Sequence, residues 1–108
     1  MVAKAGQDLQ KVRSSERMLF MVQKQVKVIN EMGFHMRPAN EFISKIMRYK
    51  SDVAFAFNGR RINAKSIMHI MAACIKCGSE ITVICDGEDE EAALEEAVSF
   101  IQSGMGEK

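Results

Sequence analysis

The chain has 108 residues, 47% of them hydrophobic and 27% charged, which suits one globular domain and excludes a large multidomain enzyme. Fifteen basic and fourteen acidic side chains leave a net charge of +1, so the charge gives no reason to expect a nucleic-acid ligand. No apolar run approaches the roughly 18 residues of a membrane span. Without a secretion signal, we expect a cytoplasmic protein whose three cysteines are reduced.

Residues 1–20 differ from the remainder, because polar and charged side chains interleave there with few apolar ones. We expect a flexible N-terminal extension, or residues that precede a true start at Met18 or Met21. A basic arm that docks a partner is a third interpretation, and it depends only on Lys4, Lys11, Arg13 and Arg17. The folded domain is expected at residues 21–108.

A strand and a helix are predicted in the first third of this domain. Val22, Val26 and Val28 alternate with polar residues, which indicates a half-buried strand. After a glycine-containing break at 30–35, Pro38 suits the first turn of a helix, where its missing N–H costs nothing. We expect this helix to end near Tyr49. Its apolar stripe comprises Ala39, Phe42, Ile43 and Ile46.

Two strands at 52–57 and 60–63 are predicted to form a hairpin. Asn58-Gly59 between them is the strongest short signal for a two-residue hairpin turn. Alternation along the first strand places three apolar side chains on one face, namely Val53, Phe55 and Phe57.

The last third predicts a helix, a strand and a helix. Ser66 can cap a short helix that runs to about Lys76, with Gly78 as its stop. Residues 81–85 alternate as a strand, and the four acids at 88–91 suit the start of a final helix, where the helix dipole favours negative charge. The buried stripe of that helix comprises Leu94, Ala97, Val98 and Ile101. The order β-α-β-β-α-β-α predicts one sheet with helices over one face.

A candidate site lies at the start of the first helix, where His35 directly precedes a turn that contains Arg37. The free N–H groups of Met36 and Arg37 should point toward the space beside the imidazole and stabilise an anion there. Arg37 adds planar donors that suit phosphate oxygens. These parts can receive a phosphoryl group on a ring nitrogen without a metal. A plain histidine cap with a solvated arginine explains the spacing about equally well.

Two runs in register resemble segments of one known family: GFHMRPA at residues 33–39 and NAKSIM at residues 63–68. The first resembles the active-site segment of HPr, the histidine-containing phosphocarrier family of the bacterial phosphoenolpyruvate-dependent sugar phosphotransferase system. The second is similar to the regulatory-serine segment of the same family. The similarity extends from Gln23 to about Glu107 without a gap. It implies an α+β open-faced β-sandwich, a four-stranded antiparallel sheet with three helices on one face.

The resemblance also implies roles for individual residues. His35 would take a phosphoryl group on Nδ1 from Enzyme I and pass it to enzyme IIA domains, with Arg37 and the backbone of Met36 and Arg37 contacting that group. Ser66 would be phosphorylated by HPr kinase/phosphorylase. The partner-docking surface would comprise Met36, Asn40, Ile67, Met68 and Met71.

Such a protein is a phosphocarrier without a cofactor rather than a free-standing enzyme. We expect a monomer that reaches membrane sugar permeases only through its partners. The alternative is a regulatory paralogue, in a nitrogen-type branch or in kinase-controlled signalling. An RNA-recognition domain has a similar element order, but residues 60–63 lack the aromatic side chains it needs.

Some residues depart from the family pattern. Met36 stands where a small or hydroxylated residue is usual, and Met32 stands where a polar residue is common. His69 replaces a usual glycine. These three differences affect the choice of partners more than the fold. Helical spacing turns Cys74 and Cys77 toward the sheet. We therefore expect buried or half-buried free thiols rather than a zinc site at this pair. The outward face of the same helix would carry Ile67, Met68, Met71 and Ile75.

Overall fold

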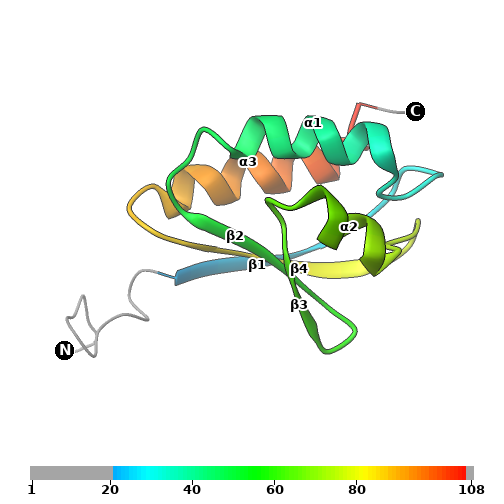
Figure 1. Cartoon of the computed structure of the whole chain (residues 1–108), viewed down its shortest axis with the longest axis horizontal. Coiled ribbons are helices and arrows are strands. Elements are labelled where there is room, and N and C mark those ends of the chain that lie inside the picture. The colour runs from blue at the N-terminus through cyan, green and yellow to red at the C-terminus, as the bar shows by residue number, and fades with distance from the viewer. Residues whose placement is uncertain (1–20, 107–108) are drawn as a thin grey trace.

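The computed structural model describes residues 21–106, and its elements follow the predicted order (Figure 1). The expected extension at 1–20 lies outside the described residues. The strands are β1 (Met21–Lys27), β2 (Asp52–Phe57), β3 (Arg60–Asn63) and β4 (Glu80–Asp86). The helices are α1 (Met36–Ile46), α2 (Ile67–Ala73) and α3 (Glu90–Gln102).

The four strands form one antiparallel sheet in the order β1-β4-β2-β3. Figure 1 shows all three helices on the same side of this sheet, so the other face is left open. The predicted open-faced α+β sandwich is therefore confirmed.

The core lies between the helices and the sheet and is centred on four aromatic rings, those of Phe34, Phe42, Phe55 and Phe100. Phe42 of α1 and Phe55 of β2 are fully buried, with ring centroids 5.3 Å apart. Phe34, which directly precedes His35, packs against both, at 5.6 Å from Phe42 and 5.4 Å from Phe55. Aromatic pairs at such separations stabilise a core beyond their buried area. The core therefore anchors the chain immediately before the candidate site.

The hairpin between β2 and β3 has the geometry that its sequence predicts. Asn58 and Gly59 have positive φ angles of 52° and 76°, as both central residues of a type I′ turn require. The pairing of Phe57 with Arg60 closes the hairpin directly beside this turn.

Helix α1 ends at Ile46, three residues before the predicted end near Tyr49. The Tyr49 N–H donates to the carbonyl of Ile46, so the chain tightens into a turn there. This turn brings the N–H groups of Lys50 and Ser51 to the carboxylate of Asp89, at 2.8 and 2.9 Å. A contact distant in sequence therefore holds the chain just beyond the end of the helix.

Helix α2 is also shorter than predicted, and this changes which side chains are buried. Cys74 has a left-handed backbone (φ 55°, ψ 50°) that ends the helix at Ala73 instead of near Lys76. The helical rotation of 100° per residue therefore does not apply beyond Ala73. As a result, the side chain of Ile75 is buried in the core, whereas Cys74 and Cys77 are exposed. The predictions of two buried or half-buried thiols and an outward Ile75 were wrong. Cys85, in contrast, is buried within β4.

The carboxylate of Asp89 gives the fold a predicted dependence on pH. A hydrogen bond from the Ser51 hydroxyl at 2.5 Å, together with the backbone N–H groups of Lys50 and Ser51, lowers the pKa of Asp89 from 3.8 to about 2. Stability gained from the ionised form is complete above the unfolded pKa and is lost as the pH falls from about 4 toward 2. We expect Asp89→Asn to flatten this part of the pH profile of thermal unfolding, measured by circular dichroism. An unchanged slope in the variant would contradict this role.

Candidate functional site

His35 occupies the N-cap position of α1 with an extended backbone (φ −98°, ψ −173°) and a half-buried side chain. Its carbonyl accepts the first helical hydrogen bond, from the Ala39 N–H at 3.0 Å. The imidazole itself forms no capping hydrogen bond with the first turn. The interpretation of His35 as a plain side-chain cap is therefore not supported.

The loop before His35 is held by a set of hydrogen bonds that the sequence analysis missed. The Asn30 side-chain amide donates to the carbonyl of Gly33 at 2.6 Å, and the Gly33 N–H donates back to the carbonyl of Asn30 at 3.0 Å. The Phe34 N–H donates to the carbonyl of Ile75 at 2.9 Å. Asn30 is buried, although asparagine is usually exposed. An asparagine three residues before a glycine is the signal that could have indicated this turn.

An open depression in the surface brings His35 together with the first two turns of α1. Met36 and Arg37 belong to the first turn, whose N–H groups have no intrahelical acceptor. These donors, the guanidinium of Arg37 and the dipole of α1 favour an anion in the depression. The structure therefore places His35, Met36 and Arg37 around one depression. The complete lining comprises His35, Met36, Arg37, Asn40, Glu41 and Ser44.

Glu41 and Ser44 were not predicted as part of this site. Glu41 follows Arg37 by four residues, so both lie on one face of α1. Helical spacing could have found Glu41 once Arg37 had been chosen. Its carboxylate introduces a negative charge on the edge of a depression that otherwise favours anions.

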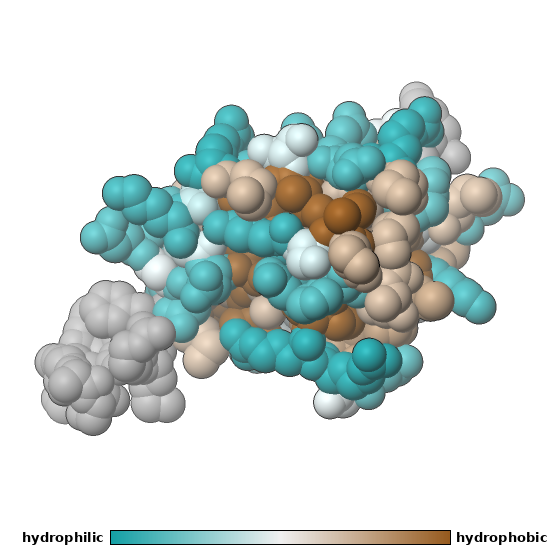
Figure 2. Space-filling view, in the orientation of Figure 1, coloured by the Kyte–Doolittle hydropathy of each residue, from teal (hydrophilic) through white to brown (hydrophobic). Residues whose placement is uncertain are grey.

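The predicted docking residues lie on α1 and α2, two helices that contact each other. Met36, Asn40 and Met68 are exposed, whereas Ile67 and Met71 are half-buried and pack against the core. Figure 2 shows apolar side chains gathered on the side of the molecule where α2 lies. Exposed apolar side chains in such numbers commonly mark a surface that contacts other proteins.

Ser66 is the N-cap of α2, as predicted. Its hydroxyl oxygen accepts a hydrogen bond from the N–H of His69 at 3.3 Å, and the residue is half-buried. The hydroxyl thus has a structural role in addition to the regulatory role that we propose below.

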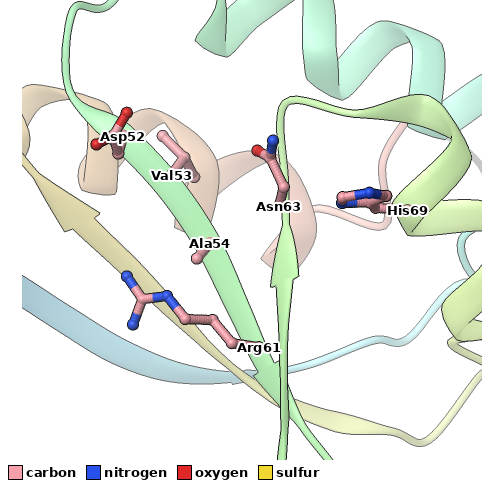
Figure 3. A pocket seen from close by; sticks show the side chains of 6 residues that line it. All are labelled: Asp52, Val53, Ala54, Arg61, Asn63 and His69. Atoms are coloured by element: carbon pink, nitrogen blue, oxygen red, sulfur yellow. The ribbon is translucent and has the colours of Figure 1, made fainter.

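His69 lies in a different groove from His35. Residues of β2, β3 and α2 line this groove (Figure 3). In this view Asn63 lies between His69 on one side and Asp52 and Arg61 on the other. The groove shares no lining residue with the depression at His35. The complete lining comprises Asp52, Val53, Ala54, Arg61, Asn63 and His69.

No group of three histidine, cysteine or acidic side chains within residues 21–106 could hold a metal ion. None of the helices described for this part of the chain is long and apolar enough to cross a membrane.

Comparisons with known proteins agree with this architecture. A family model described as "PTS HPr component phosphorylation site" matches residues 22–103. The HPr-like protein Crh of Bacillus subtilis is 42% identical over 82 residues, which cover 76% of this chain and 96% of Crh. The phosphocarrier protein HPr of Treponema pallidum is 39% identical over 88 residues, covering 82% of this chain and all of the relative.

The solved structure of a phosphocarrier protein HPr from Bacillus anthracis superimposes with a TM-score of 0.73 at 41% identity, covering 76% of this chain and 98% of that one. An HPr from Thermoanaerobacter tengcongensis gives a TM-score of 0.77 at 31% identity, covering 81% and 98%. The family match, the relatives and the shared fold together show that this chain belongs to the HPr family of phosphocarrier proteins of the bacterial phosphotransferase system.

Proposed function

We propose that the chain carries a phosphoryl group on Nδ1 of His35, accepting it from Enzyme I and passing it to enzyme IIA domains of the sugar phosphotransferase system. The observation that carries this proposal is the placement of His35. The ring lies at the start of α1 beside Arg37, within the residues that the family model matches. The hydrogen-bonded loop from Asn30 to Phe34 holds the backbone at His35 in a defined position.

The geometry suggests how the transfer proceeds. The unprotonated Nδ1 attacks the phosphorus in line, and a P–N bond forms as the bond between phosphorus and the donor breaks. The N–H groups of Met36 and Arg37 and the Arg37 guanidinium stabilise the charge on the equatorial oxygens. The same contacts hold the product, and the reverse displacement passes the group to the next acceptor. Glu41 at the edge opposes very tight retention of the anion, which suits a carrier that must release its load.

The test of this function is a phosphotransfer assay with purified components. Phosphoenolpyruvate, Enzyme I and the full chain should give a phosphohistidine that is labile in acid and has the ³¹P resonance of the Nδ1 isomer. Addition of an enzyme IIA domain should remove the label. The proposal is wrong if the chain takes no label under conditions that fully phosphorylate a standard HPr.

Phosphorylation of Ser66 by HPr kinase/phosphorylase is the regulatory part of the proposal. A phosphate there would place close to two negative charges beside Met68 of the docking surface. Like charges across an interface cost affinity and slow association. We expect Ser66→Asp to reduce the rate of His35 phosphorylation about ten-fold, measured with purified Enzyme I. Ser66→Ala is the control, because it removes the cap of α2 without adding charge. Equal rates in the two variants would contradict the electrostatic explanation.

A second candidate is a mainly regulatory HPr-like protein. The 42% identity to Crh of Bacillus subtilis favours it, since a structure of Crh describes that relative as a catabolite repression protein. His35 argues against a regulator without a phosphoacceptor. The phosphotransfer assay distinguishes the two, because a purely regulatory chain would accept phosphate at Ser66 and not from Enzyme I.

We also propose that the chain acts as a cytoplasmic monomer. Some relatives form dimers, namely Crh of Bacillus subtilis in a domain-swapped structure and an HPr from Thermoanaerobacter tengcongensis. Sedimentation equilibrium at several concentrations would distinguish a monomer from such a dimer.

A further inference from the structure

We propose that Met36 is an oxidation site, and that its sulfoxide prevents partners from docking at His35. The inference rests on the proposed function and adds a chemical control to the same site. It starts from the unusual exposure of methionine side chains: Met36 is 57% exposed, Met32 70% and Met68 77%. Exposure of the thioether to solvent gives small oxidants direct access to its sulfur.

The position of Met36 makes its oxidation consequential. Met36 directly follows His35 in the chain and lines the same depression. Any protein that brings a phosphoryl group to the ring must therefore cover Met36. A thioether suits such a surface, because it is apolar, polarizable and flexible enough to fit several partners.

The chemical step is a two-electron oxidation of sulfur by hydrogen peroxide. The sulfur lone pair attacks one peroxide oxygen, the O–O bond breaks, an S=O bond forms, and the remaining oxygen leaves as water after proton transfer. A thiol-dependent methionine sulfoxide reductase reverses the change. The product is polar, so a partner that covers Met36 would have to desolvate the S=O group. Burying an unsatisfied polar group weakens binding by about ten-fold or more.

The structure contains a matched control for this site. Met47, which follows the last residue of α1, is also 57% exposed, but it lies at the opposite end of the helix from His35. An 11-residue helix separates the two sites by roughly 16 Å. Oxidation of Met47 therefore reports the general effect of peroxide without touching the depression.

The experiment treats the full chain with hydrogen peroxide, quenches with catalase and then adds dithiothreitol. Dithiothreitol reverses sulfenic acids and disulfides of the exposed Cys74 and Cys77 but leaves sulfoxides intact. Peptide mass spectrometry locates the added oxygen, and the initial rate of phosphorylation by Enzyme I is divided by the rate of the same protein without peroxide. Wild type, Met36→Leu and Met47→Leu are compared.

We expect the treated-to-untreated ratio to fall about ten-fold in wild type and in Met47→Leu. In Met36→Leu we expect a clearly smaller fall, because of the exposed methionines of the docking surface only Met68 is then left to be oxidised. The proposal is overturned if Met36→Leu is inhibited as strongly as wild type. It is also overturned if Met36 carries oxygen while the rate is unchanged, or if the rate falls while Met36 is unmodified. Failure of the untreated wild type to accept phosphate is a separate result, because it refutes the carrier function itself.

Discussion

His35→Ala is expected to remove all acid-labile phosphate from the protein when phosphoenolpyruvate and Enzyme I are supplied. Alanine has no ring nitrogen to attack phosphorus, and the remaining donors of the depression can bind an anion but cannot form a covalent bond to it. The rate should fall by at least about 10³-fold, measured by ³¹P NMR or by retention of label after native electrophoresis. The variant should still fold, because the core beneath this segment is built by the rings of Phe34, Phe42 and Phe55, and circular dichroism checks this.

The matched control is His69→Ala, because the chain has two histidines. His69 is exposed and lies in the groove of β2, β3 and α2, away from the depression. This variant should keep its acid-labile phosphate. Retention of label in His35→Ala, or its loss in His69→Ala alone, would mean that the phosphoacceptor has been assigned to the wrong histidine.

The parts of the fold that local chemistry determines could be predicted from the sequence. Asn58-Gly59 specified the hairpin, because both residues tolerate the positive φ angles of a type I′ turn. Alternating apolar residues indicated β1, β2 and β4, the turn at Asn58-Gly59 indicated β3, and Ser66 indicated the start of α2. His35 and Arg37 were found because they neighbour each other at one helix start. Each of these features depends on residues close together in the chain.

The predictions that failed concern the end of α2 and the loop that precedes α1. The end of α2 was misplaced because Cys74 adopts a left-handed conformation that the sequence does not signal with glycine. Ile75 was assigned to the outward face of the helix for the same reason. In the structure its side chain is buried, and its carbonyl accepts a hydrogen bond from the N–H of Phe34. The role of Asn30 was missed because its side chain holds the loop before α1 rather than a helix or a strand. Helix periodicity cannot reveal such contacts, since it describes one element at a time.

The contact between the loop before α1 and the segment after α2 leads to the second large prediction, for Gly33→Ala. Gly33 has φ +67°, which is strained for alanine, and an added Cβ would lie 2.5 Å from the carbonyl oxygen of Ile75 and 2.8 Å from Cα of Lys76. Both neighbours are backbone atoms, so no side chain can rotate away. We expect a loss of about 2–4 kcal/mol in the free energy of unfolding, from backbone strain plus the forced separation of the two segments.

Gly33→Ala should also slow the phosphorylation of His35, because the His35 N–H donates to the Gly33 carbonyl at 3.0 Å and the ring follows any shift of the loop. Gly59→Ala is the control: Gly59 has φ +76°, but no atom lies within 4 Å of an added Cβ. Gly59→Ala should lose only the free energy of unfolding that comes from backbone strain, roughly 1–2 kcal/mol. It should keep the wild-type rate of phosphorylation. Urea unfolding of both variants measures the difference. Equal destabilisation by the two substitutions would show that the loop and the segment after α2 separate without cost, and that their contact does not hold His35 in place.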